Sequence, residues 1–132
     1  MLNTDLMGHV ALVSGAGSEA GIGMAIARRL GASGAKLIVT ASSSRIADRV
    51  KELRLEGFEV EGRPADLTDE SQVREFGLWA ESVWGRVDIL VNNAGMAMQG
   101  NPEVFSELAA MELHEWNLSL ARNLTTAFLL TR

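Results

Sequence analysis

The sequence contains no cysteine, which excludes disulfides, thiolate catalysis and cysteine-based zinc sites. It has no excess of positive charge either: the net charge is -5, so the electrostatic signature of a nucleic-acid-binding protein is missing. No apolar stretch approaches the ~20 residues that cross a bilayer. The first ten residues lack the basic cluster and apolar run of a signal peptide. These absences favour a cytoplasmic protein that binds neither nucleic acid nor membrane, and they leave no candidate metal site.

The composition is that of an ordinary globular protein, with 47% hydrophobic and 22% charged residues. A chain of 132 residues is long enough for one domain with a real core, and we assign residues 1–132 to it. Short apolar runs predict strands at 10–13, 37–40 and 88–92, with a weaker one over 58–64. Helical spacing of apolar residues predicts helices over 21–33, from 45 to 57, from 68 or 71 to 84, and from about Met111 onward. An irregular stretch is expected through Gly100 and Pro102.

Strands that alternate with helices at this spacing pair in parallel through right-handed crossovers. The sequence therefore predicts an α/β fold with a doubly wound parallel sheet. Four strands are few for such a sheet, and the last apolar helix runs up to the final residue, Arg132.

A glycine-rich loop joins the first strand to the first helix. Four glycines, Gly15, Gly17, Gly21 and Gly23, fall within nine residues. Where side chains are missing, backbone N–H groups can approach a pyrophosphate at the positive end of a helix. A plain tight turn would need only one or two glycines, so the loop favours phosphate binding.

The end of the second strand bears on the choice of dinucleotide. NAD-binding folds place an Asp or Glu there to bind the ribose hydroxyls, but this chain has Ala41 followed by Ser42, Ser43, Ser44 and Arg45. Hydroxyls and a guanidinium suit a 2′-phosphate, which a carboxylate would repel. NADP is therefore favoured over NAD. The alternative is that the serines cap the helix that starts near Arg45.

Several motifs in register resemble the short-chain dehydrogenase/reductase family. Residues 5–15 are similar to its leader into the first strand, with Ser14 where threonine is usual. Residues 66–69 match its acidic turn after the third strand. Residues 86–95 match the segment with its Asn-Asn-Ala-Gly signature, and 116–125 match the helix with its catalytic asparagine.

The resemblance implies a Rossmann-like sheet of strand order 3-2-1-4, incomplete on its C-terminal side, and NADP-dependent reduction of a carbonyl or oxidation of an alcohol. The broad default within the family is a 3-oxoacyl-carrier-protein reductase, and complete members are commonly homo-oligomers. The residues it assigns are Gly15, Ser18, Gly21 and Ile22 to the phosphates, Asp66 and the Leu67 backbone to adenine, Asn93, Ala94 and Gly95 to adenosine and ribose, and Asn123 to a proton relay. Ser42, Ser43 and Arg45 complete the predicted cofactor site. Plainer alternatives are that Asp66 caps a turn, that Gly95 closes a strand and that Asn123 is a buried helix polar group.

The loop departs from the family pattern. Five residues separate Gly15 from Gly21, where the family usually has three. The extra pair is best placed at Glu19 and Ala20, and we expect the Glu19 carboxylate to point away from the phosphates.

The family's proton-transfer residues are a serine, a tyrosine and a lysine four residues after the tyrosine. This chain has no tyrosine, and its two lysines, Lys36 and Lys51, fall in early segments. The 132-residue chain alone is therefore expected to be inactive. Three explanations stay open: a truncated or cleaved longer oxidoreductase, a non-catalytic NADP-binding module, or an interaction protein that pairs through the edge of its fourth strand.

Overall fold

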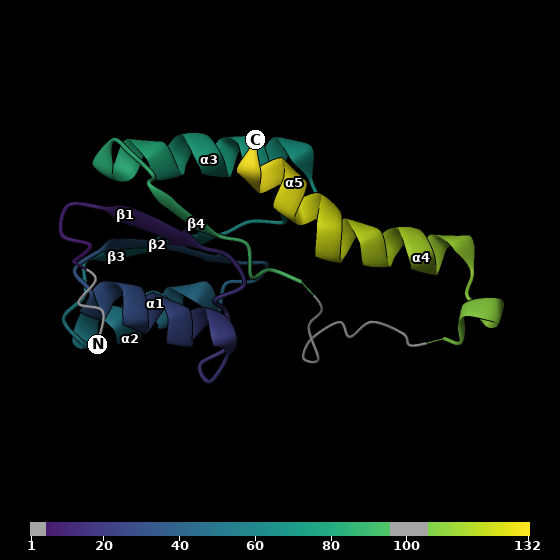
Figure 1. The fold of residues 1–132 in the computed structure, drawn as a ribbon, viewed down its shortest axis with the longest axis horizontal. Helices are drawn as coiled ribbons and strands as arrows, with labels where there is room; N and C mark the ends of the chain where they lie inside the picture. Colours follow the sequence, from purple (N-terminus) through teal and green to yellow (C-terminus); the bar gives the residue numbers. More distant parts are fainter. Residues whose placement is uncertain (1–4, 96–105) are drawn as a thin grey trace.

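Four short strands form one parallel sheet in a computed structural model that describes residues 5–95 and 106–132. The strands are β1 (Val10–Val13), β2 (Lys36–Ala41), β3 (Val60–Pro64) and β4 (Ile89–Val91). Their order is β3-β2-β1-β4, with Val10 aligned to Lys36 and Ala11 to Ile89 (Figure 1). The predicted fold and strand order are confirmed. β3 and β4 are each shorter than the predicted 58–64 and 88–92.

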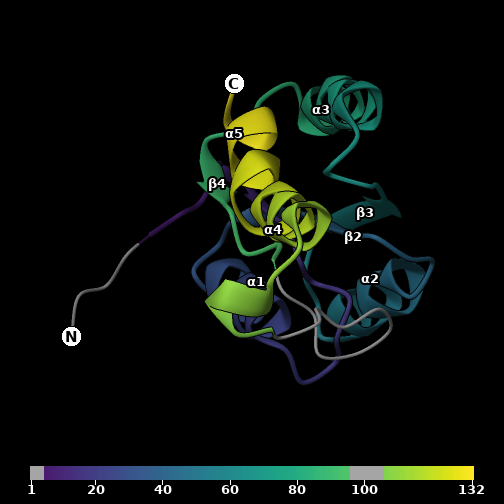
Figure 2. The ribbon, with the colours of Figure 1, turned by 90° about the vertical axis from the view of Figure 1, so that its right-hand side faces the viewer.

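Helices cover both faces of the sheet, as the apolar character of its central strands requires. Helices α1 (Ile22–Ala32) and α2 (Ile46–Leu55) lie on one face, and α3 (Glu70–Trp84) and α5 (Thr126–Thr131) lie on the other (Figures 1 and 2). Alternate residues of β1 enter opposite cores: Ala11 and Val13 pack with Met24 of α1, whereas Val10 and Leu12 pack with Phe76 of α3. The strand ends are thereby fixed in space, which positions the loops that follow them.

The start of α3 differs from the prediction. Thr68 and Ser71 were the expected N-caps, but the cap is Asp69, whose Oδ1 accepts hydrogen bonds from the N–H groups of Ser71 (2.9 Å) and Gln72 (3.1 Å). Asp69 combines an extended backbone (φ −96°, ψ 114°) with a carboxylate in reach of those amides. The hydrogen bond from the Gln72 amide is the main reason that the pKa of Asp69 lies below its usual value.

The C-terminal helical segment is not one regular helix from Met111. A 3₁₀ turn (Leu108–Ala110) precedes α4 (Leu113–Leu120), which a π-helical turn (Ala121–Thr125) joins to α5. The α4 end of this segment projects away from the sheet (Figure 1). The stretch expected through Gly100 and Pro102 lies outside the described residues. Within the described residues, no helix is long and apolar enough to cross a membrane.

Candidate functional site

The predicted phosphate loop follows β1 and packs tightly against the loop after β4. Gly15 has φ +68°, and a β-carbon there would lie 2.8 Å from the Asn93 carbonyl oxygen and 2.9 Å from the Ala94 nitrogen. A β-carbon on Gly23, in the first turn of α1, would overlap the Gly15 carbonyl and come within 2.9 Å of Asn93 Nδ2. Glycine is therefore required at both positions, by backbone conformation at Gly15 and by lack of space at both.

The long spacing in the loop is absorbed by a turn. The Gly21 N–H donates to the Ser18 carbonyl (3.1 Å), so Glu19 and Ala20 form the corners of a four-residue turn. Glu19 is exposed, as expected. The two extra residues thus bulge outward and still allow Gly21 to lead directly into α1.

Four main-chain amides around this turn lack an acceptor among the described residues, and two of them, Ser18 and Ile22, belong to exposed residues. Across residues 5–95 and 106–132, no protein group accepts from the N–H groups of Gly17, Ser18, Ile22 or Gly23. Ala16, by contrast, donates to the Thr40 carbonyl (3.0 Å). Ile22 is apolar but 72% exposed at the start of α1. Unpaired amides at the positive end of a helix form a suitable cradle for a diphosphate.

Ser14 and Asn93 bind the two loops together. The buried Ser14 hydroxyl donates to the Val91 carbonyl (3.2 Å) and accepts from the N–H groups of Asn93 (3.0 Å) and Ala94 (2.9 Å). Asn93 Nδ2 in return donates to the carbonyls of Ser14 (3.2 Å) and Gly15 (3.1 Å). Sequence reasoning missed this role of Ser14, although a hydroxyl at the end of an apolar strand was a visible signal.

The predicted 2′-phosphate group lies beside the same loop. A β-carbon on Gly17 would come 2.9 Å from the Ala41 β-carbon, so the end of β2 adjoins the phosphate cradle. Arg45 is exposed, and its Nε donates to Ser43 Oγ (3.2 Å). The serine-cap alternative fails at the side-chain level, because α2 begins after Arg45 with no side-chain cap hydrogen bond. Ser42 and Arg45 therefore present polar groups to solvent at this edge.

Asp66 follows β3 at the same edge of the sheet. Its Oδ1 accepts from the Thr68 N–H (2.9 Å) and hydroxyl (2.6 Å), which is the plainer turn-capping role. In the described part of the chain, no group donates to its Oδ2 or accepts from the N–H of the buried Leu67. Within the described residues, Asp66 Oδ2 and the neighbouring Leu67 N–H thus have no protein partner.

Asn123 lies in the π-helical turn and faces the loop after β4. A β-carbon on Gly95 would come 3.0 Å from Asn123 Oδ1, while Asn123 Nδ2 donates to the Ser119 carbonyl (3.0 Å). Such π-helical turns occur frequently at functional sites, and periodicity alone did not predict this one. The structure therefore brings Asn123 next to Gly95, at the end of the predicted cofactor site.

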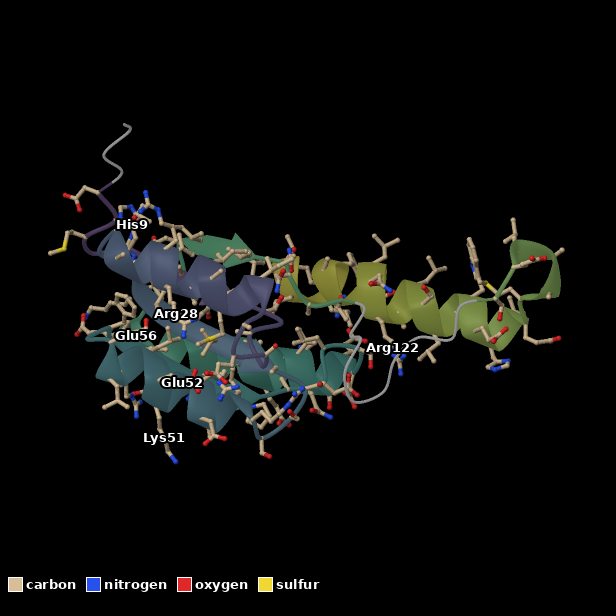
Figure 3. All side chains as sticks on the ribbon, turned by 90° about the horizontal axis from the view of Figure 1, so that it is seen from below. His9, Arg28, Lys51, Glu52, Glu56 and Arg122 are labelled. Atoms are coloured by element: carbon tan, nitrogen blue, oxygen red, sulfur yellow. The ribbon has the colours of Figure 1, made fainter. Side chains whose placement is uncertain are left out.

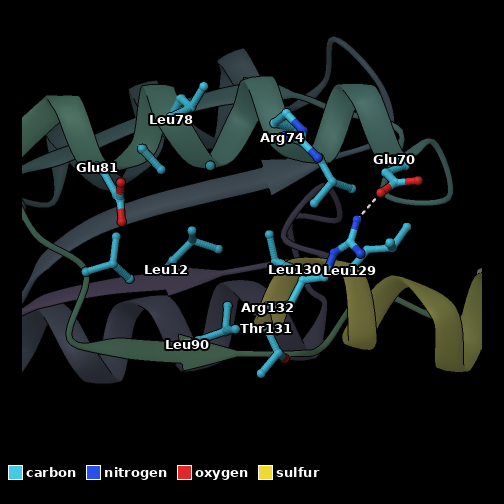
Figure 4. A pocket seen from close by; sticks show the side chains of 14 residues that line it. Leu12, Glu70, Arg74, Leu78, Glu81, Leu90, Leu129, Leu130, Thr131 and Arg132 are labelled. Atoms are coloured by element: carbon cyan, nitrogen blue, oxygen red, sulfur yellow. Dashed lines mark hydrogen bonds and ion pairs between the residues drawn. The ribbon is translucent and has the colours of Figure 1, made fainter.

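A separate cavity lies on the face of the sheet that α3 and α5 cover. It has a volume of about 650 Å³ between α3, β4 and α5, with Leu12, Leu90 and Leu130 at its base and Arg74 at its rim (Figure 4). Arg132 pairs with Glu70 across it. None of the predicted site residues lines this cavity, so it is distinct from the cradle at the glycine loop.

Comparison with known proteins identifies the family that shares this sequence and fold. Residues 9–132 match the family model described as short chain dehydrogenase. The 3-oxoacyl-acyl-carrier-protein reductase FabG of Escherichia coli is 36% identical over 125 residues, which cover 95% of this chain and 47% of that protein. A short chain dehydrogenase from Mycobacterium smegmatis superposes with a TM-score of 0.86 at 30% identity, covering 98% of this chain and 52% of that one.

A metagenomic short-chain oxidoreductase solved in complex with NADP superposes with a TM-score of 0.81 at 38% identity, covering 96% of this chain and 55% of that chain. The chain thus spans about half the length of the relatives it matches. The family model covers nearly the whole sequence, and the superposed family members share its fold. The chain belongs to the short chain dehydrogenase family.

Proposed function

We propose that this chain is the NADP-binding part of an oxidoreductase that reduces a carbonyl or oxidises an alcohol of a small molecule. The observation that carries the proposal is that the amides of Gly17, Ser18, Ile22 and Gly23 have no acceptor among the described residues. They lie in a cradle where a β-carbon on Gly15, Gly17 or Gly23 would come within 3 Å of a neighbouring atom. The diphosphate fits this cradle because it needs donors and a close backbone approach.

The remaining assignments follow the edge of the sheet. Ser18 and Ile22 hold the diphosphate through their amides, Gly15 and Gly21 leave room for it, and Ser42, Ser43 and Arg45 hold the 2′-phosphate. Asp66 Oδ2 and the Leu67 N–H bind adenine, and Asn93, Ala94 and Gly95 lie along the adenosine and ribose. The nicotinamide of the bound cofactor would supply or accept the hydride, and the protein binds and orients it.

The relatives support this chemistry. The Escherichia coli relative is a 3-oxoacyl-acyl-carrier-protein reductase, and a solved relative is in complex with NADP. A ketoacyl compound is therefore the substrate class we favour. Asn123 belongs to the proton relay beside the nicotinamide end. The sequence contains no tyrosine, so the 132-residue chain alone binds NADP without turnover.

A second candidate is a non-catalytic NADP-binding module, which the absence of tyrosine favours.

A homo-oligomer is supported by exposed apolar side chains on the projecting helical segment, where Leu113 is 72% and Leu124 63% exposed. Sedimentation of the purified chain tests self-association. We place the protein in the cytoplasm and treat residues 1–132 as one dinucleotide-binding domain.

Calorimetry with NADP and NAD tests the cofactor assignment. We expect NADP to bind about 10-fold more tightly than NAD, because the 2′-phosphate gains a charge-assisted hydrogen bond. Arg45→Glu should abolish this preference, whereas Lys51→Glu, with the same change of charge on an exposed residue of α2, should retain it. Absence of NADP binding by the folded chain would refute the proposal.

A further inference from the structure

Two arginines contact the back of the phosphate loop. Arg49 of α2 directs Nη1 at the Gly17 carbonyl oxygen (3.4 Å), and Arg28 of α1 directs Nη1 at the Glu19 carbonyl oxygen (3.4 Å). These carbonyls lie on either side of Ser18, and Glu19 belongs to the two extra residues of the loop. The arginine pair (Arg28 and Arg49) therefore contacts the part of the loop in which this chain departs from the usual family spacing.

Two glutamates of α2 hold the arginine pair in place. Glu52 Oε1 accepts from Arg49 Nη2 (2.5 Å), and both oxygens of Glu56 accept from Arg28 Nε (2.9 and 3.0 Å). Glu52 Oε2 lies 4.0 Å from Arg28 Nη2, so the four side chains form one network between α1 and α2. Figure 3 shows Arg28 reaching from α1 towards Glu52 and Glu56 on α2.

The charges of this network balance, which argues against the arginine pair as a direct phosphate ligand. Two guanidinium groups face two carboxylates, and the Arg49 side chain is only 14% exposed. A buried guanidinium that is already paired has little reach to a ligand in solvent. Its contact with the loop is instead a hydrogen bond to a main-chain carbonyl.

Peptide geometry converts that contact into an orientation of the loop amides. In a trans peptide the C=O of one residue and the N–H of the next point in opposite directions, and no described peptide bond here is cis. With the Gly17 carbonyl turned towards Arg49, the Ser18 N–H points away from the arginine pair. The Ala20 N–H does the same, because the Glu19 carbonyl is turned towards Arg28. Neither amide has an acceptor among the described residues.

We propose that Arg49 and Arg28 are positioning residues that turn the peptide groups of the loop so that the Ser18 and Ala20 amides face the cofactor diphosphate. This inference rests on the proposed NADP binding. The competing explanation is that the network only joins α1 to α2, in which case loss of either arginine would lower stability without changing the loop.

The test uses Arg49→Gln and Arg28→Gln, with Arg29→Gln as the matched control. Arg29 is the neighbouring, exposed residue of α1, and no described residue forms an ion pair with it. Amide NMR of the ligand-free chain should show shifted Gly17–Gly21 resonances and faster local motion in both variants, but not in the control. Arg49→Lys keeps a donor and should partly restore the wild-type spectrum, and it also serves if Arg49→Gln fails to fold.

Titrations then connect the loop to the ligand. NADP affinity should fall about 10-fold in either glutamine variant, since an oriented amide bond to a charged group is lost. Adenosine 2′-monophosphate has no diphosphate, so its affinity should stay within about twofold; a parallel loss would mean that Arg49 contacts the 2′-phosphate and would overturn the inference.

If Arg49→Gln and Arg28→Gln fold and their loop resonances are unchanged, the inference is also overturned, whether or not NADP binds. The proposed function would instead be refuted if the wild-type chain bound no NADP while the loop resonances changed only in the arginine variants. The orientation of the loop would then have no role in NADP binding.

Discussion

Replacement of Gly23 by alanine tests the close approach on which the phosphate cradle depends. A β-carbon at this position overlaps the Gly15 carbonyl and lies 2.9 Å from Asn93 Nδ2. Both neighbours are fixed: Gly15 by its positive φ and Asn93 by hydrogen bonds to the carbonyls of Ser14 and Gly15. The new methyl group must therefore displace main chain and not the far end of a flexible side chain.

The expected loss in free energy of unfolding has three parts. Overpacking costs roughly 1–3 kcal/mol, the two Asn93 hydrogen bonds contribute about 1 kcal/mol each, and alanine is favoured over glycine in a helix by about 1 kcal/mol. We therefore expect Gly23→Ala to lower the free energy of unfolding by about 2–4 kcal/mol. Urea unfolding followed by fluorescence of Trp79 and Trp84 measures this difference.

Gly77→Ala is the matched control. Gly77 lies inside α3, and no heavy atom is within 4 Å of the position of its β-carbon. The same chemical change should therefore stabilise the chain by about 1 kcal/mol, through helix preference alone. If the two variants shifted the unfolding midpoint in the same direction, the close approach of Gly23 to Gly15 would be wrong.

Three further predictions follow from individual contacts. Ser14→Ala should lower the free energy of unfolding by about 1–3 kcal/mol, because the amides of Asn93 and Ala94 lose their acceptor, and Ser14→Thr should restore it in the same urea assay. Leu53→Ala should cost about 2–5 kcal/mol by leaving a cavity, whereas Leu55→Ala on the same helix, at a side chain 89% exposed, should leave the unfolding midpoint unchanged. Hydrogen bonds from the Gln72 amide to Asp69 and from the Arg86 guanidinium to Asp88 hold the pKa of each carboxyl below its usual value of 3.8. Their stabilising contribution is therefore complete above about pH 5 and is lost as pH falls through the lower folded pKa values. Asp69→Asn keeps a capping oxygen that does not titrate. The midpoint temperature of thermal unfolding should therefore fall less steeply in this variant than in wild type between pH 5 and pH 2, roughly the window of that linkage. An identical slope in both proteins would contradict the role of Asp69 as a cap.

The sequence predicted best the features that depend on backbone conformation and on the burial of apolar residues. The doubly wound parallel sheet followed from the alternation of apolar runs with helical stripes, and the strand order from the family resemblance. The glycine spacing predicted the loop because only glycine leaves room for Gly15 against Asn93. These features are local, or they are repeated in many residues, so a single sequence carries them.

What the sequence did not predict depends on contacts between distant residues or on fine backbone geometry. Three polar residues within four positions could cap α3, and local dihedral angles selected Asp69. Arg28 and Glu56 are 28 residues apart, with no spacing rule to connect them. The π-helical turn at Asn123 adds about one residue to a helical turn, and the apolar spacing of this segment did not indicate it. Such features become visible only when the elements are placed in space.

Under the proposed function, cofactor binding and folding depend on the same part of the main chain. The cradle is formed by main chain, and Ser14 and Asn93 fasten it to the buried ends of β1 and β4. A ligand that binds only the folded chain raises its stability by about 2.7 kcal/mol at 100 times its Kd. NADP should give that gain to wild type and to Gly77→Ala, but not to Gly23→Ala, in which the methyl group displaces Gly15 from the cradle. Binding and stability should therefore fall together at Gly23, because the same backbone atoms serve both.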